Sequence, residues 1–424
     1  GSLGWYDVTI GNQLFEDAFY RSGVWVDTYN SWDGNLFPFS FDLNVWEPNT
    51  VKRWFYPVDT NIDFAYNLAL NSVRVLDFNG DSYREIPSQL HSTTSSGSLV
   101  SDGNLVFLVS MDKNETREFV VSYSVVDLDP VYVSDLNVLQ SGFIFDANTS
   151  YFKATLDINS GGVLKNIRSY VGSNSDLNGA SPSEVGPRFV SDSTYTVSSV
   201  SAPVFSQPSS GALVSKLNVF GDVDSGPVEF YDYNLNYTFY AKSKYFLLDA
   251  NVTSNSSLAW ESYHDSYSYL SNSLLDELVF YSSGVSTVRD VNASSNLYSL
   301  SDGNYVGVYN KSSLDSFGRI RLGSSSSESI VDSLTVFDAA SNVSLRGGLL
   351  GVSSMVDGDF VVSRLAVGVF NSLRGSDDLN DLFFGLVNAP IVSVGSTSTS
   401  DSSVPVNLDV NYSPFGDVND AMDV

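Results

Sequence analysis

Cysteine is absent from this 424-residue chain, and histidine occurs only twice. The absence of cysteine excludes a disulfide framework, a thiolate metal site and a cysteine nucleophile. It also means that cysteine content does not indicate the redox compartment. Basic residues are scarce as well, since 21 Lys and Arg stand against 49 Asp and Glu, for a formal net charge of −28. A surface of that sign repels phosphate backbones and anionic lipid, which argues against nucleic-acid binding and polybasic membrane attachment.

Long apolar runs are also missing from the chain. None approaches the roughly 18 residues of a membrane span, so we expect no transmembrane segment. Apolar residues still make up 42% of the chain and aromatic residues 13%. This composition is sufficient for real hydrophobic cores, and the length predicts more than one domain.

β-strand patterns run along almost the whole chain. Short runs of Val, Tyr, Phe, Ile and Thr alternate with clusters of Gly, Asn, Asp and Ser, which predicts an all-β protein. The clearest hairpin is Asn71 to Ile86, where Asn79-Gly80 supplies the positive φ angles of a tight turn. The strand spacing predicts an N-terminal β-sandwich over residues 1–135 and a large two-layer sandwich over residues 136–395.

One helix is expected, at Asp377–Val387, with Ser376 as its N-cap. Its apolar residues follow the i, i+3, i+4, i+7 spacing of a single helix face: Leu379, Leu382, Phe383 and Leu386.

The C-terminal region, residues 396–424, contains a Ser/Thr tract followed by a strictly alternating segment. The apolar face of that segment consists of Val404, Val406, Leu408, Val410 and Tyr412. Period-2 alternation predicts a half-buried strand on a tether. It either completes a sheet of its own chain or pairs with a neighbouring subunit. Tyr6, Val8 and Ile10 form a second alternating segment near the N-terminus.

Two stretches resemble known families. The strands from Asn71 through Tyr123 resemble the immunoglobulin-like modules of secreted carbohydrate-active proteins. The segment Tyr151–Ile167, with two glycines between its strands, is similar to the opening of galactose-mutarotase-like β-supersandwich domains, and residues 226–252 continue that likeness. The resemblance implies an immunoglobulin-like sandwich followed by a β-supersandwich.

Mutarotases use a His acid and a Glu base, and this chain offers only His91 and His264. His91 lies beside a Ser-rich stretch and is interpreted as a solvated loop residue. His264 is close in sequence to Trp260 and Glu261, which suggests a sugar-binding or acid–base group. On a strand, however, Glu261 faces away from Trp260 and His264, so a structural role is favoured. We expect no catalytic set, and no Ser-His-Asp triad is recognised in the sequence.

Oxygen-rich segments offer only weak calcium sites. Asp222-x-Asp224 is one candidate, and Asp377-Asp378 with Asp381 is another. No other metal site and no cofactor are expected.

Five of the six tryptophans lie in the first 54 residues. The favoured interpretation places them in the core of the N-terminal sandwich. The alternative is an exposed aromatic surface for sugar rings or for a subunit contact. The five are Trp5, Trp25, Trp32, Trp46 and Trp54.

Nine Asn-x-Ser/Thr sequons are consistent with a glycosylated protein outside the cell or at its surface. They begin at Asn114, Asn148, Asn236, Asn251, Asn255, Asn292, Asn310, Asn342 and Asn411.

Three function classes follow from these observations. The leading prediction is a non-catalytic extracellular subunit that self-assembles, as a homo-oligomer or homopolymer, into a filament, sheath or surface layer through strand and aromatic contacts. The second is a secreted carbohydrate-binding module. The third is a polysaccharide-active enzyme of the supersandwich type.

Overall fold

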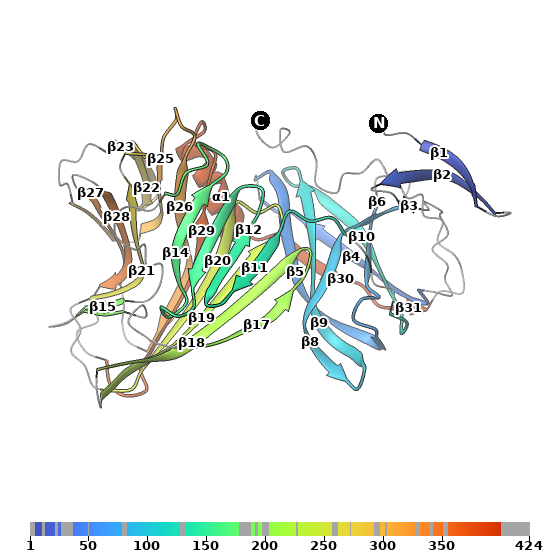
Figure 1. Ribbon diagram of the computed structural model, residues 1–424, viewed down its shortest axis with the longest axis horizontal. Coiled ribbons are helices and arrows are strands. Elements are labelled where there is room, and N and C mark those ends of the chain that lie inside the picture. Colours follow the sequence, from blue (N-terminus) through green and yellow to red (C-terminus); the bar gives the residue numbers. More distant parts are fainter. Residues whose placement is uncertain are drawn as a thin grey trace. The chain divides into compact units, whose positions relative to one another are not determined.

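A computed structural model shows an almost entirely β-stranded chain that divides into two compact units (Figure 1). The first unit comprises residues 1–133 and 389–424, and the second comprises residues 134–388. Within these, the structure describes residues 5–10, 13–21, 24–26, 37–49, 51–78, 83–127, 130, 132–177, 188–190, 194–196, 203–225, 228–256, 262–271, 273–291, 297–301, 303–327, 331–338, 342–350 and 355–399.

The prediction of an all-β fold is confirmed. A single helix occurs among the described residues, and no helix there is long and apolar enough to cross a membrane.

The first unit contains three antiparallel sheets. The largest has the order β30-β4-β10-β6-β7, with β31 also paired to β4; the second has the order β5-β9-β8, and the third β1-β2-β3. The strands are β1 Trp5–Ile10, β2 Gln13–Arg21, β3 Val24–Val26, β4 Phe39–Trp46, β5 Arg53–Leu68, β6 Arg74–Phe78, β7 Tyr83–Ile86, β8 Ser88–Ser96, β9 Leu99–Met111, β10 Thr116–Tyr123, β30 Ile391–Val394 and β31 Ser398–Thr399.

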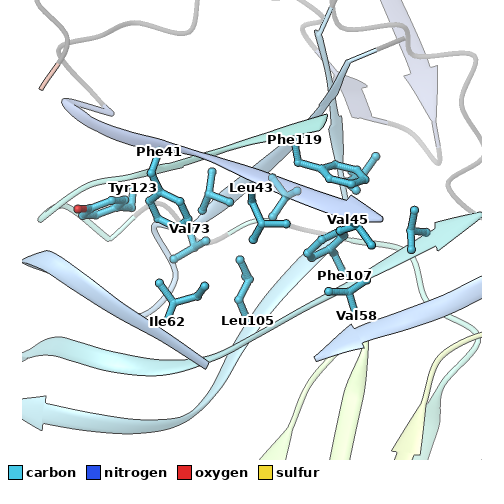
Figure 2. Close-up of a cluster of buried hydrophobic side chains, with 14 of the residues drawn as sticks. Phe41, Leu43, Val45, Val58, Ile62, Val73, Leu105, Phe107, Phe119 and Tyr123 are labelled. Carbon is cyan, nitrogen blue, oxygen red and sulfur yellow. The ribbon is translucent and has the colours of Figure 1, made fainter. Parts of the chain in front are cut away.

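The two larger sheets of this unit share one hydrophobic core. Alternate residues of β4, such as Phe41 and Leu43, point toward Leu105 and Phe107 of β9 (Figure 2). This packing of alternating apolar faces makes the unit a β-sandwich. The predicted hairpin is confirmed as β6 paired with β7.

The chain returns to the first unit after the second one is complete. Strand β30 pairs with β4, with Ile391 opposite Trp46. The sequence division had instead assigned residues up to 395 to the second domain. The short run Ile391–Val394 carries no signal of which sheet it joins, because its partner lies more than 340 positions earlier in the chain.

The structure describes only one of the two alternating segments predicted near the chain termini. Tyr6, Val8 and Ile10 do lie in a strand, β1, and that strand pairs with β2 of the same chain. The segment from Val404 to Tyr412 lies outside the described residues.

The placement of tryptophans in the core is wrong where the structure describes their side chains. Trp46 and Trp54 are each 45% exposed, whereas Phe and aliphatic residues fill the core. Trp46 ends β4 on the face opposite to Val45, so strand alternation places it outside. Trp5 and Trp25 lie in β1 and β3, and Trp32 lies outside the described residues.

The second unit is built around a nine-stranded sheet with the order β17-β18-β19-β20-β29-β26-β25-β22-β23. A four-stranded sheet, β11-β12-β13-β14, and a six-stranded sheet, β16-β15-β21-β28-β27-β24, accompany it. The strands are β11 Asn137–Ser141, β12 Ile144–Asn148, β13 Phe152–Asp157, β14 Val163–Ser169, β15 Arg188–Val190, β16 Thr194–Thr196, β17 Val204–Ser210, β18 Val214–Ser225, β19 Val228–Tyr240, β20 Tyr245–Ser254, β21 Ser262–Ser271, β22 Glu277–Ser282, β23 Val285–Asp290, β24 Leu297–Ser301, β25 Gly303–Tyr309, β26 Ser316–Ser326, β27 Val331–Asp338, β28 Asn342–Leu350 and β29 Phe360–Gly368.

The smaller sheets form a second layer on one face of the large sheet. The Tyr237 hydroxyl of β19 donates a hydrogen bond to the Gly162 carbonyl oxygen, with 2.8 Å between the two oxygens. The Phe152 ring of β13 lies 5.9 Å from the Phe246 ring of β20. The buried guanidinium of Arg319 on β26 lies directly against Gly347 of β28. The predicted two-layer sandwich is therefore present.

The predicted helix is confirmed as α1, Ser376–Val387, but its predicted N-cap is wrong. Ser376 is the first helical residue, and Gly375 precedes it with φ of 55°, where no side chain caps the helix. A Cβ at Gly375 would lie 2.8 Å from the Tyr309 hydroxyl, so the close approach of β25 selects glycine. Leu379 and Phe383, on the predicted apolar face, are buried.

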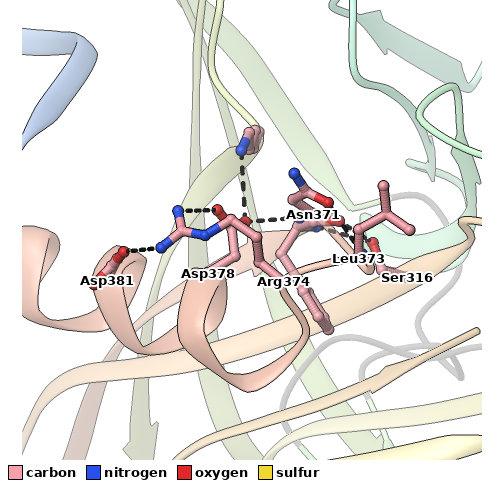
Figure 3. Close-up of polar contacts among 8 residues, drawn as sticks. Ser316, Asn371, Leu373, Arg374, Asp378 and Asp381 are labelled. Carbon is pink, nitrogen blue, oxygen red and sulfur yellow. Dashed lines mark hydrogen bonds and ion pairs between the residues drawn. The ribbon is translucent and has the colours of Figure 1, made fainter. Parts of the chain in front are cut away.

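Polar contacts fix the start of α1 (Figure 3). The Asp378 carboxylate accepts a hydrogen bond from the Asn371 backbone at 2.7 Å and lies 3.4 Å from Arg374 and 3.5 Å from Lys244. Arg374 also pairs with Asp381 at 2.5 Å. Two carboxylates of this calcium candidate are instead paired with cationic side chains, Asp378 with Arg374 and Lys244 and Asp381 with Arg374.

Candidate functional site

The clearest polar constellation lies across four adjacent strands of the nine-stranded sheet, β18, β19, β20 and β29 (Figure 1). Strand register brings Asn218, Asn236, Asp249 and Arg364 into one row, each directly opposite the next. A parallel row contains Phe220, Asn234 and Asn251. We call these seven residues the polar face.

The polar face lies on the side of the sheet that is turned away from the core. Asn234 and Asn236 alternate along β19 with Leu235 and Tyr237, which are fully buried against the second layer. Side chains at successive strand positions point to opposite faces. Polar residues at every second position therefore share one accessible surface held on a rigid sheet.

Hydrogen bonds orient the groups on this surface. The Asn218 side-chain amide donates to the side-chain oxygens of Asn234, at 2.7 Å, and Asn236. The Arg364 Nε donates to the Asp249 Oδ1 at 3.1 Å. These contacts align amide, carboxylate and guanidinium groups in two neighbouring rows, and Phe220, 41% exposed, lies at their β18 end.

Two carboxyl groups in this region have altered acidity. Burial raises the pKa of Asp249, and the nearby cations Arg364 and Lys216 partly offset that effect. Asp222 also has a raised pKa, chiefly because of burial and then because Asp232 lies directly across the strand pair and shares a hydrogen bond with it. Both groups thus hold a proton more readily than an isolated aspartate does.

No metal centre is assembled among the described residues, where no group of three or more His, Asp or Glu side chains converges. The second calcium candidate, Asp222 with Asp224, therefore forms no such group there. Asp232, the cross-strand neighbour, instead accepts a hydrogen bond from Asn255 at 2.6 Å.

The sequence-predicted sugar group is only partly described. Trp260 and Glu261 lie outside the described residues, and His264 lies in β21 opposite Arg188 of β15 and Gly348 of β28. A role for these three residues stays a prediction.

The interpretation of His91 as a solvated loop residue is wrong. His91 lies in β8 and is only 4% exposed. Its Nε2 lies 3.2 Å from the Asp59 Oδ1, and its Nδ1 lies 2.9 Å from the Ser92 Oγ. The surrounding Ser and Thr residues suggested a loop, but they extend β8 along β9, and this pairing carries His91 into the sheet.

Several sequons lie on or beside the polar face. Asn236 and Asn251 belong to it, and Asn255 contacts Asp232 at its edge. Among the others, Asn114 is exposed, whereas the Asn310 side chain accepts hydrogen bonds from the backbone of Ser312 and Ser313. Asn292 and Asn411 lie outside the described residues, and Asn148 and Asn342 lie in β12 and β28. Glycosylation stays a prediction.

Sequence reasoning did not find Asn218, Asp249 or Arg364. The alternation of Asn234 and Asn236 with apolar residues was a usable signal for a polar outer face. It did not reveal which strands would lie beside β19, and the row exists only through that pairing.

No family model matches the chain, and no curated protein matches it in sequence. Among solved structures, the chain is similar to an α-mannosidase from Enterococcus faecalis V583, with a TM-score of 0.58, 7% identity, and coverage of 84% of this chain and 46% of that one. It is also similar to a protein in glycosyl hydrolase family 38 from Enterococcus faecalis, with a TM-score of 0.54, 8% identity, and coverage of 84% and 47%. This chain thus spans about half the length of either structure.

A galactose mutarotase-like protein from Clostridium acetobutylicum is similar at a TM-score of 0.36 and 10% identity, over 56% of this chain and 99% of that one. The resemblance to mutarotase-like domains has no support from sequence matching. The two Enterococcus faecalis structures share the fold of this chain over 84% of its length.

Proposed function

We propose that this chain is an extracellular, carbohydrate-associated protein whose polar face binds a hydroxyl-rich glycan without chemical turnover. The row of Asn218, Asn236, Asp249 and Arg364 carries this proposal. Amide, carboxylate and guanidinium groups donate to and accept from sugar hydroxyls, and hydrogen bonds already orient them here. The ring of Phe220 adds an apolar surface for the CH face of a sugar.

The structural neighbours also favour a carbohydrate ligand. The structures with TM-scores of 0.54 and 0.58 are named as a protein in glycosyl hydrolase family 38 and an α-mannosidase. The polar face itself contains no histidine, and its one carboxylate, Asp249, is paired with Arg364. Binding is therefore the better proposal for this surface than catalysis.

Glycan binding by the full chain is expected to depend on the polar face. On a glycan array followed by calorimetry, Arg364→Ala and Phe220→Ala should each weaken the affinity for a bound glycan by about tenfold or more, because a charge-assisted hydrogen bond and a stacking surface are lost. The matched control is Lys165→Ala, which removes an exposed ion pair with Asp157 in the same unit.

The protein for this test should come from a host that does not glycosylate Asn236 or Asn251, so that both amides stay unmodified. The proposal fails if no glycan binds, or if binding survives in Arg364→Ala and Phe220→Ala at the strength of the control.

Self-assembly into a surface filament or layer is a second candidate function. Strand β23 ends the nine-stranded sheet, and its Val285 and Val288 are 61% and 41% exposed. An edge strand with exposed valines presents backbone donors and acceptors to a strand of another subunit.

We expect Val285→Lys with Val288→Lys to shift sedimentation from polymer toward monomer, because charge on an edge strand opposes strand addition. The control is Leu139→Lys, at an exposed position of β11 in a different sheet. Monomeric wild-type protein at every concentration, with no ordered polymer by electron microscopy, would reject assembly through this edge.

A further inference from the structure

A β-bulge interrupts β8 at Ser92. The pairing of β8 with β9 shifts between His91 and Thr94, and Ser92 has φ of 51°, which is unusual for a non-glycine residue within a strand. Gly103 of β9 permits this bulge, since a Cβ there would lie 2.8 Å from Thr93 and 3.2 Å from the His91 carbonyl oxygen. The bulge thus holds a costly backbone conformation at an exposed serine.

The same conformation places the Ser92 hydroxyl beside a buried imidazole. The Ser92 Oγ lies 2.9 Å from the His91 Nδ1, and the His91 Nε2 lies 3.2 Å from the Asp59 Oδ1. The Asp59 carboxylate accepts a hydrogen bond from the His91 Nε2, so the imidazole tautomer with its hydrogen on Nε2 is favoured. The His91 Nδ1 is then left as an acceptor for the Ser92 hydroxyl.

Neighbouring amides hold the carboxylate in position. The Asn104 side chain of β9 donates to the Asp59 Oδ1 at 2.9 Å, and the Asn61 side chain of β5 donates to the Asn104 oxygen at 3.3 Å. Three strands therefore support one chain of hydrogen bonds that runs from Asn61 to Ser92. The sequence did not reveal this set, because the serine and histidine are adjacent whereas Asp59 lies 32 residues from His91.

We propose that Ser92 is an activated nucleophile with His91 as its general base, in a site that takes small carboxylic esters. A serine hydroxyl is activated when it is hydrogen-bonded to a base and a carboxylate orients that base. Asp59 and Asn104 are positioning residues. This site lies in the first unit and does not rest on the proposed glycan binding.

The reaction begins when the Ser92 Oγ attacks the ester carbonyl carbon and its proton passes to the His91 Nδ1. The carbon–oxygen bond to the alcohol then breaks, and that alkoxide takes the proton from His91. Water next gives a proton to His91 and attacks the acyl-serine. The bond to the Ser92 Oγ breaks, and the proton returns to that oxygen, which releases a carboxylic acid.

The test is labelling of the full chain by a fluorophosphonate probe, with the modified peptide located by mass spectrometry and the hydrolysis of p-nitrophenyl acetate measured in parallel. Wild-type protein should be labelled at Ser92. His91→Gln should slow labelling by about 100-fold or more, the usual contribution of a general base. Asp59→Asn should lower kcat for the ester while KM stays unchanged, which a merely structural role would not produce.

Ser92→Gly is the decisive variant, because glycine accepts the positive φ and the sheet keeps its geometry while the hydroxyl is lost. It should abolish both labelling and ester hydrolysis. Ser101→Ala, which alters a half-buried serine of β9 whose hydroxyl donates a hydrogen bond to Asp102, should leave both unchanged. Equal labelling of wild type and Ser92→Gly, or no label at Ser92 while a serine hydrolase in the same tube is fully labelled, would overturn the proposal.

Discussion

Glu47→Ala should destabilise the first unit by about 3–5 kcal/mol, the usual cost of leaving one partner of a buried ion pair without its counter-charge. The Glu47 side chain is 0% exposed and that of Arg53 is 1% exposed, and Arg53 Nε donates to the Glu47 Oε2. The other carboxylate oxygen accepts the Asn49 backbone N–H at 2.8 Å. Removal of the carboxylate therefore deprives a buried guanidinium of its counter-ion and also frees a backbone donor.

Urea unfolding followed by tryptophan fluorescence measures the fall in the free energy of unfolding of the first unit, since five of the six tryptophans lie in the first 54 residues. Asp112→Ala is the matched control, because it breaks the neighbouring pair of Lys52 and Asp112, whose side chains are 40% and 73% exposed. An exposed pair of this kind contributes about 0–1 kcal/mol. A similar fall in the free energy of unfolding in the two variants would show that burial of Glu47 and Arg53 has no special energetic role.

Gly162→Ala should destabilise the second unit by about 2–5 kcal/mol, the sum of backbone strain and overpacking. Gly162 has φ of 77°, a conformation that an L side chain rarely adopts. A Cβ there would lie 2.7 Å from Val219 of β18, within the core between the two layers. The Gly162 carbonyl oxygen also accepts the Tyr237 hydroxyl, so a shift of this turn would break that bond.

Thermal unfolding followed by circular dichroism compares this variant with Gly142→Ala. Gly142 has φ of 61°, and a Cβ there would meet nothing within 4 Å. The control therefore includes the strain of about 1–2 kcal/mol without the clash. If Gly142→Ala proved as destabilising as Gly162→Ala, the contact with Val219 would not contribute.

Local patterns in the sequence predicted much of the fold. Alternating apolar residues predicted the strands, the turn chemistry of Asn79-Gly80 predicted the hairpin of β6 and β7, and i, i+4 spacing predicted the buried face of α1. The pair of strands around Gly162 is likewise present as β13 and β14. Each of these features depends on contacts between residues close in sequence, so the signal and the structure occupy the same stretch of chain.

The candidate sites were harder to predict, because they arise from pairing between distant strands. Asn218 and Arg364 lie 146 positions apart along the chain, yet both belong to one row of the same sheet. His91 appeared to be a loop residue until the pairing of β8 with β9 placed it beside Asp59. Periodicity specifies which face of a strand a residue occupies, but it carries no information on which strand lies next to it.

The sequence by itself determined the all-β class, the small number of histidines and the excess of acidic residues, because composition and period-2 alternation act locally and additively. Only the tertiary structure decided that Asn218, Asn236, Asp249 and Arg364 form one row, and that Ser92 meets a buried imidazole. The physical reason is register. Strand pairing is a long-range choice governed by the packing of whole faces, and a shift of one residue would turn every one of these side chains to the opposite side of its sheet.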